Sequence, residues 1–289
     1  MRIGDYTIGD GNPPFVIAEA SINHCGNLGR ALEMVQVAKN ANCQAVKFQT
    51  FRAVDVCSPV QMVTYQSRGM EVTEPRINIF RRCELPESAW PVIKAECDRV
   101  GILFMSTPET PRDLGLLLEV GIPAIKIGSD NLTNLPMLRS CALDDIALPI
   151  ILSTGMSNFD EILNAVSIIK AQQLALLACT SQYPCPIAEA NVQRVANLRE
   201  HFIAEVGYSD HTDGHTAAIM AVALGASIIE CHFTLSNMLE GPEHHWAKEP
   251  DALRDYVYYI DRAYKARGDG IVYPSAAERA NKAKYQRAA

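Results

Sequence analysis

The sequence predicts a single-domain (β/α)8 TIM barrel, and three observations lead to this prediction. Eight apolar runs rich in Val and Ile recur along the 289 residues, and segments with helical periodicity separate them. Runs that are apolar throughout are typical of parallel strands buried on both faces. Apolar residues make up 48% of the chain, which is enough for a sizeable core. Eight strand–helix units within about 250 residues match a closed barrel better than a doubly wound sheet.

Each expected strand ends in small or polar residues, which mark the start of a loop. The eight expected strands are residues 15–21, 45–51, 102–108, 124–130, 149–155, 174–180, 204–210 and 226–234. Helical periodicity is clearest in "LGRALEMVQVAKNAN", "ESAWPVIKAECDRVG" and "DEILNAVSIIKAQ". These segments predict helices that cover the outside of the barrel.

Residues 52–85 interrupt the alternation with a long polar stretch that contains "YQSRGMEVTEPRINIFRRCELP". Loops of this length are uncommon in compact domains unless they have a function. Two interpretations stay open. The segment is either a surface excursion, or a βα-loop that covers the mouth of the active site or meets a neighbouring subunit.

Charge and cysteine content exclude some classes of function. A net charge of −7 argues against non-specific binding to nucleic acid. Nine cysteines are scattered without a CxxC pair, which is typical of reduced thiols in the cytoplasm and not of a disulfide framework. The first residues, "MRIGDYTIGD", contain no apolar signal region, and no apolar run approaches the roughly 18 residues of a membrane span. We expect a soluble cytoplasmic protein without nucleic-acid or membrane partners.

Polar residues gather at the carboxyl ends of the expected strands, where barrels hold their active sites. Because side chains alternate along a strand, residues two apart share a face. Such pairs are Lys47 with Gln49, Ser209 with His211, and Glu230 with His232. The other polar residues at these ends are Glu19, Thr107, Lys126, Ser129, Ser153 and Thr180. One polar residue in a strand is more often structural, but polar groups on all eight strands at one end indicate a binding site.

The types of these side chains indicate the kind of ligand. Burying Lys and Glu costs several kcal/mol unless they pair or bind a charged group. Two lysines, a row of hydroxyl groups and two histidines at one mouth suit a phosphorylated acid and a divalent metal.

The stretch "GYSDHTDGHT", residues 207–216, contains two histidines four residues apart, a spacing that aligns side chains on a helix. Here His211 follows an expected strand, whereas His215 precedes an expected helix. We therefore expect His211 to share an ion with His232, because adjacent parallel strands lie about 4.8 Å apart. His215 is interpreted as a structural residue near the start of the helix.

At these residues the chain resembles the sialic acid synthase family, the phosphoenolpyruvate-dependent synthases of nonulosonic acids. The blocks that carry the resemblance include "FVIAEASINHCGN", "AVKFQTF", "STPET", "IKIGSDNLTNLP", "ILSTGMSNFDEI", "CTSQYPCP", "GYSDHT" and "GPEHHWAKEP". They run in order over nearly the whole expected barrel. Their joint occurrence is specific, although no single block is.

The resemblance implies an aldol-type condensation of phosphoenolpyruvate with the open-chain aldehyde of an amino sugar. It implies that His211 and His232 bind a divalent metal, Mn²⁺ first and Mg²⁺ or Co²⁺ as alternatives, which polarises the aldehyde oxygen. The resemblance implies that Lys47 and Thr107 bind the carboxylate of phosphoenolpyruvate, and that Lys126, Ser129 and Ser209 bind its phosphate, with Gln49 and Ser153 nearby. It implies that Glu19 orients the sugar and the attacking water. Tyr183 and Glu243 would line the pocket of the acceptor.

The chain departs from the family pattern at the acceptor end. Asn131 stands where the family usually has Asp or Glu, Asp130 where it usually has Gly, and Glu243 where Asp is more usual. The sequence stops at Ala289, where the family usually continues into an antifreeze-like domain that supplies an arginine to the partner subunit. The arginines that we expect to replace this donor are Arg68, Arg76, Arg81 and Arg82. We also expect a homodimer, because a subunit contact is the simplest way to close the mouth of the barrel.

Three functional hypotheses follow. The first is a synthase that uses phosphoenolpyruvate and an N-acyl amino sugar, such as N-acetylmannosamine or a 6-deoxy diamino hexose. The second has the same chemistry with a different aldehyde acceptor. The third is an idle barrel that acts as a binding or scaffold subunit, and the joint presence of Glu19, Lys47, Lys126, His211 and His232 speaks against it.

Overall fold

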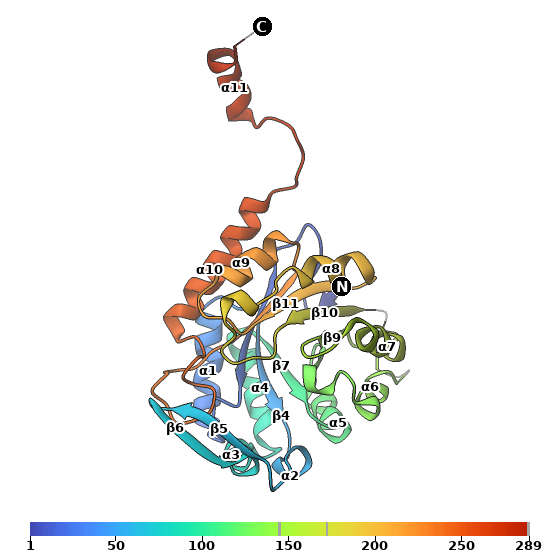
Figure 1. Ribbon diagram of the computed structural model, residues 1–289, viewed down its shortest axis with the longest axis vertical. Helices are drawn as coiled ribbons and strands as arrows, with labels where there is room; N and C mark the ends of the chain where they lie inside the picture. Colours follow the sequence, from blue (N-terminus) through green and yellow to red (C-terminus); the bar gives the residue numbers. More distant parts are fainter. Residues whose placement is uncertain (144–145, 172, 288–289) are drawn as a thin grey trace.

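Eight parallel strands form a nearly closed barrel at the centre of the protein (Figure 1), in a computed structural model that describes residues 1–143, 146–171 and 173–287. The strands are β3 (Phe15–Ser21), β4 (Ala45–Thr50), β7 (Leu103–Pro108), β8 (Ile125–Ile127), β9 (Ile150–Ser153), β10 (Leu174–Cys179), β11 (Glu205–Asp210) and β12 (Ile228–His232). Their order in the sheet is β7-β4-β3-β12-β11-β10-β9-β8. Strands β7 and β8, at the two ends of this order, lie side by side. The predicted single-domain TIM barrel is confirmed.

Each expected strand is present. Most strand ends lie within two residues of their predicted positions. The largest difference is β8, which ends at Ile127 although a strand was expected over residues 124–130. The backbone turns at Gly128, and Ser129–Asn131 form a short 3₁₀-helix, η1. This turn moves Ser129 and Asp130 from the barrel wall to its rim.

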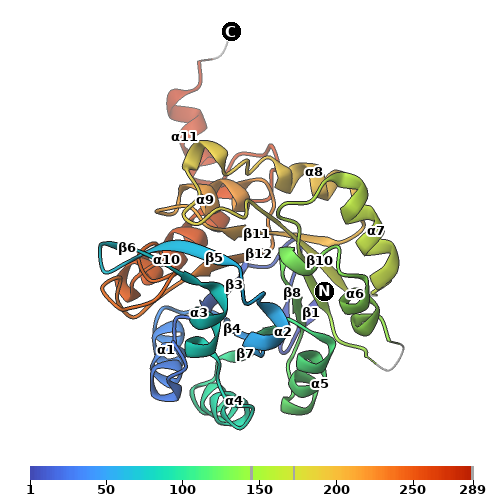
Figure 2. The same cartoon turned by 60° about the horizontal axis from the view of Figure 1, so that its bottom comes forward.

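A helix follows each strand and covers the outside of the barrel (Figure 2). These helices are α1 (Leu28–Asn40), α4 (Ala89–Val100), α5 (Pro111–Val120), α6 (Leu135–Cys141), α7 (Phe159–Ile169), α8 (Arg194–His201), α9 (Thr216–Ala223) and α10 (Pro250–Arg267). Local sequence fixes where several of them begin. In α5 the Thr110 side chain accepts from the Asp113 amide, and Asp113 accepts from the Thr110 amide. This capping box satisfies two amide groups that the helix itself leaves unpaired.

The amino-terminal end of the barrel is closed by apolar packing. A short hairpin of β1 (Arg2–Ile3) and β2 (Tyr6–Thr7) lies there. Ile3 and Ile8 pack against inward-facing Phe15, Met105 and Ile151, and all five are at most 2% exposed. Truncating one of these larger side chains to alanine is expected to cost about 2–5 kcal/mol. Because apolar side chains fill the amino-terminal end of the barrel, the polar side chains lie at the carboxyl ends of the strands.

The long segment between β4 and α4 has secondary structure of its own. It contains α2 (Ala53–Val56), the antiparallel strands β5 (Met62–Ser67) and β6 (Met70–Pro75), and α3 (Arg76–Cys83). We call residues 52–85 the β4–α4 excursion. Its α3 packs on the barrel through Phe80, whose ring centroid lies 4.9 Å from that of Phe51.

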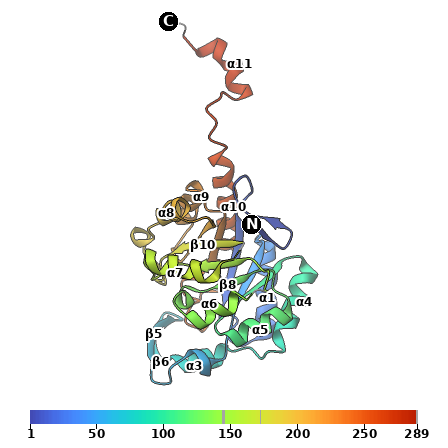
Figure 3. The ribbon, with the colours of Figure 1, turned by 90° about the vertical axis from the view of Figure 1, so that its right-hand side faces the viewer.

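The carboxyl-terminal segment leads away from the barrel. After α10 an extended stretch connects to α11 (Ala276–Tyr285), which lies at the opposite end of the molecule from the β4–α4 excursion (Figures 1 and 3). In the described part of the chain, none of the helices combines the length and the apolar character that a membrane crossing requires.

Candidate active site

A cavity of about 720 Å³ opens at the carboxyl ends of the strands. Every predicted site residue lines it: Glu19, Lys47, Gln49, Thr107, Lys126, Ser129, Ser153, Tyr183, Ser209, His211, His232 and Glu243. Strand register brings several of them together. His232 is the register partner of Glu19, and Glu19 that of Lys47. Residues that are far apart in the sequence thus form one polar surface at the carboxyl ends of the parallel strands.

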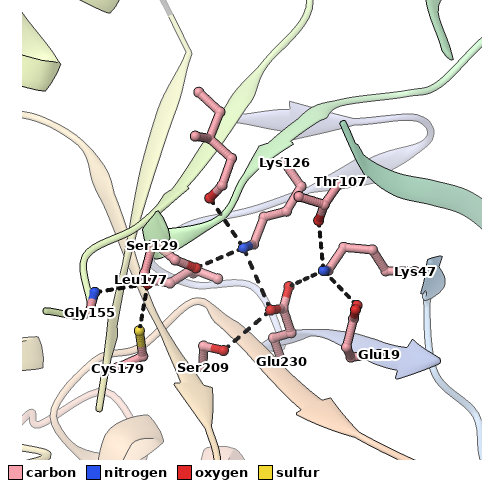
Figure 4. A network of polar contacts seen from close by, with 12 residues as sticks. Glu19, Lys47, Thr107, Lys126, Ser129, Gly155, Leu177, Cys179, Ser209 and Glu230 are labelled. Carbon is pink, nitrogen blue, oxygen red and sulfur yellow. Dashed lines mark hydrogen bonds and ion pairs between the residues drawn. The ribbon is translucent and has the colours of Figure 1, made fainter. Parts of the chain in front are cut away.

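Lys47 is held at the floor of the cavity by groups from three strands (Figure 4). Its ammonium lies 2.6 Å from Glu19 Oε2 and donates to Thr107 Oγ1 at 2.9 Å. Lys47 and Glu19 are at most 3% exposed. Although burial opposes its charge, Glu19 and Glu230 together raise the pKa of Lys47. Lys47 is therefore a cation at neutral pH, fixed in direction by the two strands beside it.

Lys126 occupies the neighbouring position and shares a partner with Lys47. It donates to Ser153 Oγ at 2.7 Å, and its nitrogen lies 3.6 Å from Glu230 Oε1. The other Glu230 oxygen lies 3.7 Å from Lys47 Nζ. Burial lowers the pKa of Lys126, and the attraction of Glu230 offsets only part of this effect. A bound anion would restore the preference of Lys126 for its charged form.

Glu230 is the centre of this network, although its role was not predicted. Ser209 Oγ donates to it at 3.2 Å (Figure 4). Although burial opposes ionisation, Lys126 and Lys47 lower the pKa of Glu230 to about 2. Its place two residues before His232 on the same strand face was the available signal. The sequence could not show that one carboxylate would lie between both lysines.

The two carboxyl groups of this network, those of Glu19 and Glu230, differ in pKa. Burial raises the pKa of Glu19 to about 7, and the attraction of Lys47 counters only part of that rise. Glu19 therefore exchanges a proton near neutral pH, while Glu230 stays ionised. Paired carboxyl groups with separated pKa values are typical of acid–base sites.

Ser129 lies on the rim formed by η1 and is oriented by its neighbours. Its hydroxyl oxygen accepts from the Gly155 amide at 3.0 Å and lies 3.3 Å from Cys179 Sγ. Figure 4 shows this contact across the turn after β9. The early end of β8 makes the contact possible, because a continued strand would carry Ser129 along the barrel wall.

His211 and His232 face each other across the cavity, with ring centroids 5.5 Å apart. His211 Nδ1 lies 2.7 Å from the Thr180 carbonyl oxygen, so it carries the proton. The lone pair is then on Nε2, which lies 3.4 Å from Ser209 Oγ. Burial and the nearby His232 lower the pKa of His211 to about 4, so the ring is neutral at neutral pH. His215 instead stacks on Tyr259 at the start of α9, with ring centroids 4.2 Å apart.

His232 is oriented by a carboxylate, an arrangement typical of metal-binding histidines. Its Nδ1 lies 3.4 Å from Glu243 Oε2, and neither atom has another hydrogen-bond partner in the described part of the chain. Two imidazoles that line one cavity fit a divalent transition metal such as Mn²⁺ or Co²⁺. Within residues 1–143, 146–171 and 173–287, no three His, Cys, Asp or Glu side chains are grouped closely enough to form a metal site unaided. Further ligands would be oxygen atoms of substrate or water.

Aromatic rings form the wall beside the histidines. The Tyr183 ring lies 4.3 Å from that of His211, and the Trp246 ring lies 4.7 Å from that of His232. Tyr183 and Trp246 contact each other at 5.2 Å between centroids. Trp246 was not predicted, because it lies in the irregular loop after β12, where strand parity gives no signal.

A second pair of carboxyl groups lies at the opposite side of the cavity. Asn131 Nδ2 donates to Glu109 Oε2 at 3.2 Å, and its side-chain oxygen accepts from Asn134 at 2.7 Å. Burial raises the pKa of Glu109 well above its usual range, and Asp130 beside it adds to this rise. The carboxyl groups of Glu109 and Asp130 therefore lie close to Asn131. The sequence did not reveal this arrangement, because it depends on the η1 turn meeting the end of β7.

The β4–α4 excursion forms one wall of the cavity, through Thr64, Tyr65, Gln66, Glu71, Arg76 and Phe80. The position of the excursion at the cavity favours the interpretation that it belongs to the mouth of the site over that of a plain surface excursion. Of the four arginines expected to reach the acceptor, Arg76 lines the cavity. Arg82 pairs with Glu74, and Arg68 with Glu240.

Comparison with known proteins identifies the family. The model of the NeuB family matches residues 34–272. The N,N'-diacetyllegionaminic acid synthase of Campylobacter jejuni is 37% identical over 272 residues, which are 92% of this chain and 81% of that protein. The pseudaminic acid synthase of the same organism is 31% identical over 274 residues, which are 93% of this chain and 79% of that protein.

A solved structure agrees with these matches. The crystal structure of N-acetylneuraminic acid synthetase from Leptospira borgpetersenii, in complex with citrate, superposes with a TM-score of 0.88 and 32% identity. The alignment covers 100% of this chain and 98% of that chain. The resemblance inferred from the sequence motifs is confirmed, and the chain belongs to the NeuB family.

Proposed function

We propose that this chain condenses phosphoenolpyruvate with the open-chain aldehyde of a sugar. The products are a 2-keto-3-deoxy acid of the nonulosonic type and inorganic phosphate. The observation that carries the proposal is the pair of buried lysines, each within 4 Å of a carboxylate, at the floor of a cavity lined by hydroxyl groups. Membership of a family whose named members are acid synthases supports it.

Each lysine is assigned one anionic group of phosphoenolpyruvate. Lys47 and Thr107, which already contact each other, bind the carboxylate. Lys126 binds the phosphate with Ser129 and Ser209, and Ser153 orients its ammonium. Charge-assisted hydrogen bonds from fixed donors are the strong ones, so this arrangement positions C3 of the enol toward the acceptor.

The charge balance supports a divalent metal. Lys47 and Lys126 face the carboxylates of Glu19 and Glu230, so the floor of the cavity has little excess positive charge. Phosphoenolpyruvate is a trianion near neutral pH and needs more positive charge than two paired lysines supply. We propose that His211 and His232 hold a divalent cation, Mn²⁺ first, through their free ring nitrogens. When bound, such an ion supplies Lewis-acid polarisation of the acceptor carbonyl.

Glu19 is the proposed base. Its pKa, raised by burial to about 7, suits proton transfer near neutral pH. Glu19 accepts a proton from the water that attacks C2 of the substrate, and Lys47 at 2.6 Å holds the carboxylate in position. Phosphate then leaves from C2. Glu243 keeps the His232 ring in the orientation that exposes its other nitrogen.

The acceptor region combines carboxylate groups with an apolar face, which suits a sugar that has N–H donors and a methyl group at C6. Glu109 and Asp130 line one side of the cavity. Glu243 lies on the other side, beside His232, where Tyr183 and Trp246 offer an apolar face. We propose a 6-deoxy diamino hexose as the preferred acceptor and N-acetylmannosamine as a poor one. Against the apolar face, the 6-hydroxyl group of N-acetylmannosamine would lose its hydrogen bonds to water without gaining a partner. Another aldehyde acceptor is the second candidate.

The decisive experiment supplies the chain with phosphoenolpyruvate, Mn²⁺ and a panel of aldehyde sugars. We expect phosphate release that depends on the sugar, with one 2-keto-3-deoxy acid formed per phosphate and identified by mass. Phosphate release without a new carbon–carbon bond, or no release with any sugar, would contradict the proposal. The latter result would favour the scaffold alternative. Cytoplasmic location and a homodimer stay predictions, checked by fractionation and by light scattering.

A further inference from the structure

Outside the cavity, three segments of the chain meet at two cysteines and a histidine. Cys25 lies in the loop between β3 and α1, Cys83 is the last residue of α3, and His244 lies in the loop after β12. Cys25 Sγ is 3.4 Å from His244 Nε2 and 3.3 Å from the Glu240 carbonyl oxygen. We call Cys25, Cys83 and His244 the thiol cluster.

The two cysteines lie in the same part of the fold. Cys83 belongs to a small apolar cluster with Ile79, and Cys25 packs against this cluster. The backbones also touch. Gly26 adopts φ +69°, and a Cβ at this position would overlap the Arg82 carbonyl oxygen. The residues next to Cys25 and Cys83 are thus in close contact, which brings the two cysteines near each other.

His244 is prepared to accept the proton of Cys25. The imidazole is 1% exposed, and its Nδ1 lies 2.6 Å from Thr234 Oγ1. Thr234 donates its hydroxyl proton to the Ser236 carbonyl at 3.2 Å, so its oxygen accepts from Nδ1–H. This fixes the tautomer and directs the lone pair of Nε2 toward Cys25.

The two thiols differ in acidity and exposure. The hydrogen bond from Cys83, and to a lesser extent His244, lower the pKa of Cys25 to about 5 against the effect of burial. The same contact and burial raise the pKa of Cys83. All nine cysteines lie in the described ranges, and Cys25 alone among them is not buried. A partly exposed thiolate beside a second thiol is the arrangement of redox-sensitive cysteine pairs.

We propose that the thiol cluster is a redox site in which Cys25 and Cys83 form a reversible disulfide. With a hydroperoxide as oxidant, the Cys25 sulfur attacks one oxygen, the O–O bond breaks, and the thiol proton leaves with the other oxygen. Cys25 is then a sulfenic acid. The Cys83 thiol attacks this sulfur, the S–S bond forms, the S–O bond breaks and water leaves. The two thiols lose two electrons, which the hydroperoxide accepts.

The disulfide would join the β4–α4 excursion to the barrel. Cys83 ends α3, and the hairpin before it contacts the loop that carries His244, because the Gly241 amide donates to Ser67 Oγ at 3.3 Å. The bond would fix the wall of the cavity that this excursion forms. The inference does not depend on the identity of the acceptor sugar.

Peptide mapping of the oxidised chain tests the proposal. The full chain is treated with hydrogen peroxide, remaining thiols are alkylated, and the digest is compared with a sample reduced by dithiothreitol. We expect one disulfide that links the peptides of Cys25 and Cys83 and disappears on reduction. Linkage of other cysteines, or an unmodified Cys25 while buried cysteines react, would overturn the proposal.

Two variants and one control sharpen this test. In Cys83→Ser the sulfenic acid at Cys25 has no partner, so dimedone should label Cys25 in that variant and much less in the wild type. His244→Gln should slow alkylation of Cys25 at least tenfold. Cys43→Ser, a buried cysteine outside the thiol cluster, should leave the Cys25–Cys83 linkage unchanged. If Cys83→Ser does not fold, the peptide map of the oxidised wild-type chain still tests the proposal, because that experiment needs no variant.

Discussion

The two ends of the cavity are built in different ways. At the end assigned to phosphoenolpyruvate, Lys47, Lys126 and Glu230 come from strands and are at most 3% exposed. At the end assigned to the acceptor, Glu109 and Asp130 follow strand ends, and Arg76 begins α3 of the excursion. Hydrogen bonding across the barrel fixes the first set, whereas turns and loops position the second. If the proposed function holds, the barrel strands determine the chemistry and the loops determine which sugar is used.

The largest expected effect concerns the histidines between the two ends. His211→Ala or His232→Ala should reduce turnover below detection and lower Mn²⁺ retention, because each removes one of two proposed protein ligands. Metal content after dialysis, measured by mass spectrometry, checks the prediction. His215→Ala is the matched control and should keep metal and turnover, since its ring stacks on Tyr259 outside the cavity. Metal loss in His215→Ala with retention in His232→Ala would show that the pairing is wrong.

The second effect tests the strand-built end. Lys126→Ala should weaken phosphoenolpyruvate binding by about 2 kcal/mol, about thirtyfold, because it removes one partner of a buried charge pair. Titration calorimetry measures the dissociation constant. Lys265→Ala on the exposed face of α10 should leave it unchanged. Equal binding by both variants would exclude Lys126 from the site.

The third effect tests the loop-built end. Arg76→Ala should raise the KM of the acceptor about tenfold and leave the dissociation constant of phosphoenolpyruvate unchanged, because a charged hydrogen-bond donor is worth roughly 1.5 kcal/mol. Arg81→Ala, an exposed neighbour on α3, is the control. If Arg76→Ala weakened phosphoenolpyruvate equally, the two ends would not be independent.

The smallest effect is on stability and depends on pH. Because the pKa of Glu109 is raised in the folded state, the unfolded chain loses this proton first as pH rises, and the free energy of unfolding falls. Glu109→Gln removes the titration. It should raise the melting temperature by about 2 °C at pH 8 and leave it unchanged near pH 4. The exposed Glu119→Gln should show neither effect, and a gain for Glu109→Gln at pH 4 alone would contradict the sign.

The difference between residues on strands and residues on loops also explains how much of the site could be predicted from the sequence. Strand parity predicted that Lys47, Ser209 and His232 share one surface, because the period of a strand and the order of a barrel leave few alternatives. The early end of β8 was not predicted, because residues 124–130 were interpreted as one strand although Gly128 is a residue type that often marks a turn. Hence the contact between Asn131 and Glu109 was visible only in the structure.

The central claim is that the floor of the cavity is that of a phosphoenolpyruvate-dependent synthase while its acceptor end has been rebuilt. The most direct test compares kcat/KM for N-acetylmannosamine and for a 6-deoxy diamino hexose, with saturating phosphoenolpyruvate and Mn²⁺. We predict a preference of at least about tenfold for the diamino hexose, equal to about 1.4 kcal/mol in transition-state binding. Equal or better turnover of N-acetylmannosamine would contradict the account and assign plain sialic acid synthesis to this chain.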